Sequence, residues 1–256
     1  MSSEINLALI GASGVVGKKI ISLLEKKNVK VKNFYPLGSS SVGDKISFND
    51  QIFEIESLSN FDCASVDVAI FSAGSSVARD YAPDFVKKGV YVVDLSSEFR
   101  YEEDIPLIIP EINPQALIDA DGPILIANPN CSVSQLLIAI EPIHRKFNID
   151  ILNIATYQAV SGTGRKAVEE LHNQVEDRSL EPDIYPKQIA FNVIPQCDVF
   201  LENDFTKEEM KVTWETKKIL DPNIEVQATC ARVPVVNGHS EAVFFRTEHN
   251  ISKDEI

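Results

Sequence analysis

The feature that most constrains the fold of this chain is a glycine-rich loop near its start. Residues 5–10 form an apolar, β-branched run, and residues 14–27 carry apolar side chains at helical spacing. Between them the chain reads Gly11-Ala-Ser-Gly-Val-Val-Gly17, which predicts a strand, a tight turn and a helix. At such a turn, backbone N–H groups and the helix dipole can hold a pyrophosphate. The loop therefore predicts a dinucleotide-binding domain, with Gly11, Ser13, Gly14, Val15, Val16 and Gly17 at the cofactor.

The rest of the first half alternates between strand and helix patterns. Strands are expected at 31–37, 66–71, 90–95 and 124–127, a helix at 75–88, and a small hairpin over 46–58 around Asn49-Asp50. Strands that alternate with helices indicate a parallel sheet covered on both faces. The first half is thus expected to be a Rossmann-type α/β domain.

The pattern changes after an apolar helix at 133–147. A long strand at 149–160, a glycine-rich loop at 161–164 and a helix at 167–175 follow. Thr206-Lys-Glu-Glu209 is a capping box that opens a helix to about 220, and 224–232 and 241–247 are expected to be adjacent strands. We expect an α+β, antiparallel second domain and divide the chain into 1–131 and 132–256. Ser252 starts a helix signal just before the sequence ends, so the second domain is expected to be incomplete at its C-terminal end.

Charge and composition limit the classes of partner. Lys and Arg number 24 and Asp and Glu 38, a net charge of −14, which argues against nucleic acid and anionic membranes as partners. No apolar stretch is long enough to cross a bilayer, and a cytoplasmic location is the default expectation. The four cysteines and four histidines lack CxxC and HExxH spacing, so we expect reduced thiols and no protein-built metal site.

The end of the second expected strand bears on the choice of cofactor. A carboxylate usually receives the ribose 2′-hydroxyl of NAD about 20 residues beyond the loop. Here the chain reads Leu37-Gly-Ser39-Ser40-Ser41, with hydroxyls and no carboxylate. Hydroxyls tolerate a 2′-phosphate that a carboxylate would repel, so NADP is favoured over NAD, with Ser39 and Ser40 as contacts.

Cys131 has the position of a nucleophile. It follows the expected strand 124–127 and directly precedes an apolar helix, where unpaired N–H groups favour a thiolate. The alternative for any free cysteine is that of a small buried apolar residue, and we apply this interpretation to Cys63, Cys197 and Cys230.

Five segments together resemble the aspartate-semialdehyde dehydrogenase family, over essentially the whole chain and in the family's order. They are the Gly11–Gly17 loop, Asn128-Pro-Asn-Cys-Ser132, Gln158-Ala-Val-Ser-Gly162, Phe191-Asn-Val-Ile-Pro195 and Arg232-Val-Pro-Val-Val-Asn-Gly-His-Ser240. The related N-acetyl-glutamyl-phosphate reductases carry Gly and Tyr on either side of the cysteine. Asn130 and Ser132 flank it here, which favours the semialdehyde enzyme.

The resemblance implies an NADP-dependent oxidoreductase that interconverts L-aspartate 4-semialdehyde plus phosphate and L-4-aspartyl phosphate, feeding lysine, threonine and methionine synthesis. It makes Cys131 the nucleophile that carries a thioester, His239 the acid/base residue and Gln158 the residue that positions the carbonyl. It also implies a homodimer or homotetramer.

The resemblance also assigns the residues that bind the ligands. Arg232 grips the substrate carboxylate, Glu208 contacts the amine, Asn130 lies at the substrate, and Arg100 and Lys211 bind phosphate. Ser161 and Gly162 are placed at the cofactor.

Without the family, several of these residues have plainer interpretations. His239 could be a core histidine, Gln158 an exposed strand residue, and Glu208 with Lys211 a surface ion pair on one helix face. Two other functions stay open: an N-acetyl-glutamyl-phosphate reductase and a catalytically inactive dinucleotide-binding fragment.

Overall fold

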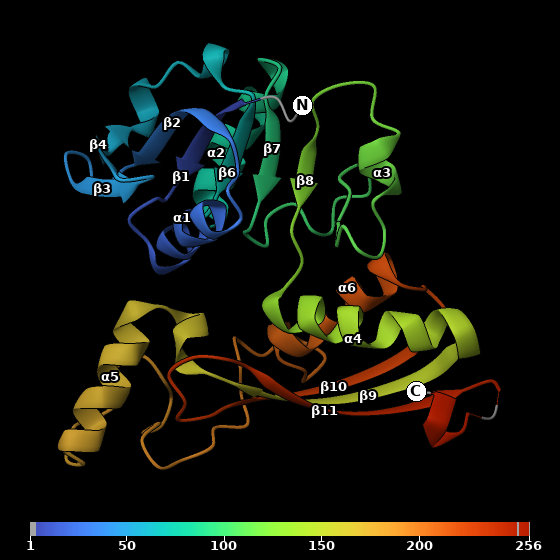
Figure 1. The fold of residues 1–256 in the computed structure, drawn as a ribbon. Helices are drawn as coiled ribbons and strands as arrows, with labels where there is room; N and C mark the ends of the chain where they lie inside the picture. The colour runs from blue at the N-terminus through green and yellow to red at the C-terminus, as the bar shows by residue number, and fades with distance from the viewer. Residues whose placement is uncertain (1–3, 250, 256) are drawn as a thin grey trace. The chain divides into compact units, whose positions relative to one another are not determined.

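The computed structural model describes residues 4–249 and 251–255. The chain divides into two compact units, Met1–Pro129 and Asn130–Ile256. Figure 1 shows the helices and strands of both. Within the described residues, no helix is long and apolar enough to span a membrane.

The first unit is built on a six-stranded parallel sheet in the order β5-β2-β1-β6-β7-β8. The strands are β1 (Ile5–Ile10), β2 (Val31–Gly38), β5 (Glu56–Ser57), β6 (Val68–Phe71), β7 (Tyr91–Asp94) and β8 (Leu125–Ala127). The order reverses at β1, which pairs with β2 on one side and β6 on the other. In open parallel sheets, such a reversal opens a crevice at the carboxyl ends of the strands, where ligands bind.

Helices cover both faces of this sheet, as the alternation of side chains in β1 requires. Leu7 and Leu9 pack in a cluster with Ile21 of α1 (Val15–Lys26). Ala8 and Ile10 point the other way and pack in a cluster with residues of α2 (Ser75–Lys87). The doubly covered parallel sheet confirms the expected α/β class of the first half.

The remaining elements of the first unit are short. The expected hairpin is present as β3 (Lys45–Phe48) and β4 (Gln51–Glu54). Its turn residues Asn49 and Asp50 both have positive φ, the conformation that a two-residue hairpin turn needs and that Asn and Asp tolerate. The others are the 3₁₀ turns η1 (Leu58–Asn60) and η2 (Cys63–Ser65), and α3 (Gln115–Ile118).

The second unit has a three-stranded mixed sheet, and here two expectations were wrong: the last two strands are not adjacent, and the sheet is not wholly antiparallel. The strands are β9 (Ile149–Gln158), β10 (Glu225–Arg232) and β11 (Ser240–Thr247), in the order β10-β9-β11. The last two are therefore not neighbours, and β10 runs parallel to β9 while β11 runs antiparallel to it. A period-2 pattern reports which face of a strand is buried and not which strand it pairs with, so the sequence could not reveal the central place of β9.

Two helices cover one face of this sheet, as Figure 1 shows, and among the described residues of the unit no helix is seen on the opposite face. The two are α4 (Cys131–Phe147) and α6 (Lys207–Ile219). The predicted capping box is present in α6: Thr206 Oγ1 accepts the Glu209 N–H, and the Glu209 carboxylate accepts the Thr206 N–H. The other elements are η3 (Val160–Thr163), α5 (Arg165–Glu176) and η4 (Lys253–Glu255).

Candidate active site

Cys131 is the first residue of α4 and its thiol is exposed. Asn130 caps the helix, and its Oδ1 accepts the Ser132 N–H at 2.8 Å. The partial positive charge of a helix start stabilises an anion such as a thiolate.

The other three cysteines, Cys63, Cys197 and Cys230, are buried. Burial raises the pKa of Cys63, that of Cys197 to about 11 and that of Cys230 to about 12. Cys131 is thus the accessible thiol of the four.

Glu208 ties Asn130, the residue before Cys131, to Gln158. Its Oε1 accepts Asn130 Nδ2 at 2.8 Å and Gln158 Nε2 at 3.0 Å. Gln158 is 2% exposed, so the alternative of an exposed strand residue does not hold. Burial alone raises the pKa of Glu208, but the Lys211 charge and the hydrogen bonds from both amides outweigh it and hold that pKa below its usual value. Glu208 is therefore a carboxylate that fixes two amides.

Glu208 and Lys211 form an ion pair at 3.0 Å, and both side chains are largely buried, so it is not a surface pair. Lys211 Nζ also donates to Asp198 Oδ2 at 2.7 Å. Burial favours a lower pKa for Lys211, but the two carboxylates outweigh it and raise that pKa. Two of the three donors of this ammonium are therefore taken by carboxylates, and one is left for a further acceptor.

Arg232 and His239 share one partner, the backbone of Ala159. Arg232 is 8% exposed, its Nη1 donates to the Ala159 carbonyl at 2.7 Å, and its Nε is buried with no acceptor among the described residues. His239 Nδ1 accepts the Ala159 N–H at 3.0 Å, so the neutral ring carries its proton on Nε2. A Cβ on Gly162 would lie 3.3 Å from Arg232 Nη1 and 3.4 Å from His239 Nε2. Both side chains therefore border the space that Gly162 leaves open.

The pKa of His239 is lowered, first by burial and then by the positive charge of Arg232, with Glu208 opposing. We expect an NMR titration of His239 to give a midpoint below its ordinary value of 6.5. Arg232→Met removes the positive charge that lowers this pKa and should raise the midpoint, while Arg232→Lys should leave the midpoint close to that of the native chain. A midpoint that Arg232→Met does not move would contradict the assigned cause.

Five of the eight expected cofactor residues of the first unit line a cavity of about 390 Å³, and Val15, Val16 and Gly17 do not. It is bordered by Gly11, Ser13 and Gly14 from the loop, and by Ser39, Ser40 and Ser41 beyond β2. Ser13 Oγ donates to Ser41 Oγ at 2.8 Å, which joins the two segments. None of its lining residues is Asp, Glu, Lys or Arg.

Two glycines of the loop are required by its geometry. Gly11 has φ +85°, and a Cβ there would lie 2.9 Å from the Ser72 backbone. A Cβ on Gly17 would lie 2.3 Å from the Gly11 carbonyl oxygen. Such a bare loop before a helix fits a dinucleotide phosphate. Val15 and Val16 are exposed on the first turn of α1 and are not among the residues that line the cavity.

The other expected site residues lie elsewhere in the fold. Arg100 belongs to the first unit, where Nε donates to the Ser96 carbonyl at 3.0 Å and Nη2 to the Leu95 carbonyl at 3.2 Å. Ser161 and Gly162 belong to η3 in the second unit. Among the residues that the structure describes, no cluster of three or more His, Cys, Asp or Glu side chains could hold a metal ion.

Sequence reasoning missed two acidic residues at this site. Asp198 holds Lys211, and Glu215, fully buried, accepts the Asn130 backbone N–H at 2.6 Å. Glu215 follows Glu208 by seven residues on α6, which places both on one face, and that spacing is the signal that could have revealed it.

Comparison with known proteins shows the family of the chain. Residues 6–120 match the family model described as the semialdehyde dehydrogenase NAD binding domain, and residues 140–256 match the semialdehyde dehydrogenase dimerisation domain. The chain is 48% identical to the aspartate-semialdehyde dehydrogenase of Shewanella violacea, over 96% of this chain and 75% of that one.

Solved structures give the same result. The fold is similar to the crystal structure of aspartate semialdehyde dehydrogenase II from Vibrio cholerae complexed with ASA, with 41% identity, a TM-score of 0.95, and coverage of 98% of this chain and 76% of that one. It is also similar to the enzyme from Candida albicans with NADP, with 25% identity, a TM-score of 0.73, and coverage of 98% and 73%. The chain belongs to the aspartate-semialdehyde dehydrogenase family.

Proposed function

We propose that this protein is an NADP-dependent, phosphorylating aspartate-semialdehyde dehydrogenase that acts through a thioester on Cys131. The observation that carries the proposal is the exposed thiol at the start of α4, linked through Asn130 and Glu208 to Gln158. The names of its relatives support the choice of substrate. In the cell, the reaction would serve lysine, threonine and methionine synthesis.

In this proposal the Cys131 thiolate attacks the aldehyde carbon, and the carbonyl oxygen becomes an oxyanion. His239 Nε2–H, fixed by the bond from Ala159 to Nδ1, can donate to that oxygen. Bound NADP would supply the hydride acceptor. The Gly11–Gly17 loop, whose glycines leave space for phosphate, would hold its pyrophosphate. The acyl group stays on sulfur as a thioester. Phosphate oxygen then attacks the acyl carbon, and the thiolate leaves.

Arg232 is proposed to bind the substrate carboxylate because its guanidinium is buried and still has an unmet donor at Nε. Guanidinium and carboxylate can form two parallel hydrogen bonds. Glu208 is proposed to contact the amine, and Arg100 and Lys211 the phosphate. In that role Lys211 would use the third donor of its ammonium, since Asp198 and Glu208 accept the other two.

The test of this proposal is NADPH formation by the purified chain with NADP, phosphate and L-aspartate 4-semialdehyde. We expect turnover that requires phosphate and that is absent with N-acetyl-glutamate semialdehyde. Preference for the second aldehyde would identify a reductase of the related family. Cofactor binding without turnover on either aldehyde would identify a catalytically inactive dinucleotide-binding protein.

NADP is expected to bind more tightly than NAD, by roughly tenfold, since hydroxyls without a carboxylate line the cavity beyond β2. The preference is moderate because no Arg or Lys lines it. Calorimetric titration of both cofactors measures the ratio, and Ser39→Asp should reverse it by repelling the 2′-phosphate. Equal affinities in the native chain would refute the role of the serines.

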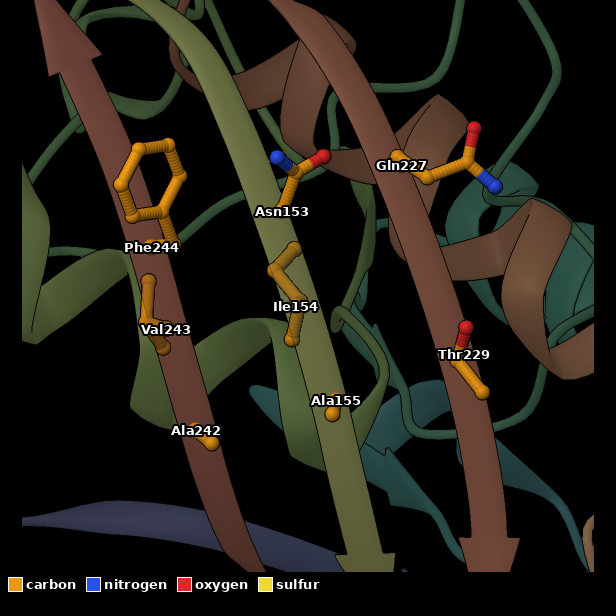
Figure 2. Close-up of a pocket in the computed structure, with 8 residues that line it drawn as sticks. All are labelled: Asn153, Ile154, Ala155, Gln227, Thr229, Ala242, Val243 and Phe244. Carbon is orange, nitrogen blue, oxygen red and sulfur yellow. The ribbon is translucent and has the colours of Figure 1, made fainter.

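The uncovered face of the β10-β9-β11 sheet is proposed to be the interface of a homodimer. A hollow of about 360 Å³ lies on the sheet. Figure 2 shows the side chains from all three strands that line it. Phe244 is 64% exposed there, between small and uncharged neighbours such as Ala155 and Ala242. A second copy would cover this face by the same surface on both subunits. The description of the matching family model as a dimerisation domain supports this assignment.

Phe244→Asp is therefore expected to convert a dimer to a monomer in sedimentation velocity runs at micromolar concentration. The matched control is Ile52→Asp, which alters a side chain 67% exposed in the β3–β4 hairpin and should leave the dimer intact. A native chain that sediments as a monomer, or a Phe244→Asp variant that stays dimeric, would contradict this interface.

A further inference from the structure

Two buried carboxylates of α6 hold Asn130, the residue that precedes Cys131. The Asn130 backbone N–H donates to Glu215 Oε2 at 2.6 Å, and its Nδ2 donates to Glu208 Oε1 at 2.8 Å. Glu215 is completely buried and Glu208 is 7% exposed. One carboxylate thus fixes the backbone of Asn130 and the other fixes its side chain.

The contact of Glu215 supplies what the sequence of α4 lacks. In a capping box, a Glu or Gln three residues into the helix accepts the N–H of the capping residue. That position in α4 is occupied by Val133, whose side chain cannot accept a hydrogen bond. Glu215 accepts the same N–H from a different helix, so the start of α4 depends on α6.

We propose that Glu215 is a positioning residue that fixes the Cys131 thiol at the first turn of α4. The proposal builds on the proposed function, because it concerns the same nucleophile. Without Glu215, the buried Asn130 N–H loses its acceptor, and a buried donor without a partner is costly enough to move the backbone. Cys131 is the next residue and moves with it. A displacement of about 1 Å at a reacting group can cost roughly 100-fold in rate.

Glu208 cannot replace this contact. Its Oε1 already accepts two amides and its Oε2 accepts Lys211 Nζ at 3.0 Å. Glu208 holds the Asn130 side chain, whose Oδ1 accepts the Ser132 N–H at the start of α4. The Asn130 backbone N–H is held by Glu215 alone of the two carboxylates.

The experiment compares Glu215→Leu with Glu215→Gln, whose amide oxygen can still accept the Asn130 N–H without the charge. The readouts are kcat, KM and the rate of Cys131 alkylation by iodoacetamide. We expect Glu215→Leu to lower kcat and the alkylation rate 10- to 100-fold with KM within about twofold of the native value. Glu215→Gln should keep both rates within about threefold.

Glu209→Leu is the matched control on the same helix. Glu209 accepts the Thr206 and Cys230 N–H groups, and neither bond involves Asn130. Its loss should lower the melting temperature and leave kcat within about twofold at temperatures where the variant is folded. Equal kcat losses in the Glu209 and Glu215 variants would show a general structural role and overturn the proposal, as would a Glu215→Gln variant as slow as Glu215→Leu.

If Glu215→Leu does not fold, Glu215→Asp replaces it, because the shorter carboxylate keeps the charge and loses the reach. The proposal then requires Asp to be slower than Gln, and the opposite order overturns it. Alkylation needs neither substrate nor cofactor. A chain inactive on the aldehyde but with the expected alkylation differences would contradict the proposed function and support the role of Glu215.

Discussion

Replacing Cys131 with Ser is expected to lower kcat by at least about 1,000-fold while NADP binds with unchanged affinity. A serine hydroxyl stays protonated at a helix start and is a poor nucleophile, and the exposed thiol there is the only accessible one of the four cysteines. The assay is NADPH formation from L-aspartate 4-semialdehyde with phosphate, with NADP affinity measured by calorimetry on the same preparation.

The matched control for this prediction is Cys63→Ser. Cys63 is a buried thiol in the core of the first unit, and its replacement should leave kcat nearly unchanged. Turnover of Cys131→Ser near the native rate would remove Cys131 from the mechanism.

The second large effect is expected for Arg232→Lys, which keeps the charge and loses the planar fork of donors. Hydrogen bonds to charged groups contribute about 1.5–3 kcal/mol, so losing one predicts a drop of roughly 10- to 100-fold in kcat/KM. The pH profile should keep its shape, because the positive charge that lowers the pKa of His239 remains.

Arg246→Lys serves as the matched control, since Arg246 also pairs with a carboxylate, Asp150, but is exposed on β11. Its replacement should change kcat/KM by less than twofold. An unchanged kcat/KM in Arg232→Lys would contradict the carboxylate role, and so would an equal loss with an aldehyde substrate that lacks the carboxylate.

Local signals in the sequence were enough to predict most elements of the fold. The Gly11–Gly17 loop, the Asn49-Asp50 turn and the Thr206–Glu209 capping box each depend on residues a few positions apart, and all three appear in the structure as expected. The pairing of β9 with both β10 and β11 joins residues far apart in sequence. Such pairing leaves no local signature in the sequence, so the parallel pairing of β10 with β9 was missed.

The features of the candidate site likewise fall into those with a local sequence signal and those without one. The place of Cys131 at a helix start could be predicted because a helix start after a strand is a local pattern, whereas Arg232 and His239 were assigned to the site only through the resemblance to the family. The burial of Glu208 and Lys211 could not, because charges three residues apart on a helix usually face water. They are buried here since Asn130, Gln158 and Asp198 satisfy them, and Asn130 and Gln158 lie 78 and 50 residues away from Glu208 in the sequence.

The most direct test of the central claim is to mix the native chain with NADP and L-aspartate 4-semialdehyde in the absence of phosphate. The thioester cannot then be released by phosphate, so we expect a burst of about one NADPH per chain and an acyl adduct on the peptide that contains Cys131, detected by mass spectrometry. Added phosphate should discharge the adduct and start steady turnover. A burst without an adduct on Cys131, or steady turnover at the full rate without phosphate, would contradict the proposed mechanism.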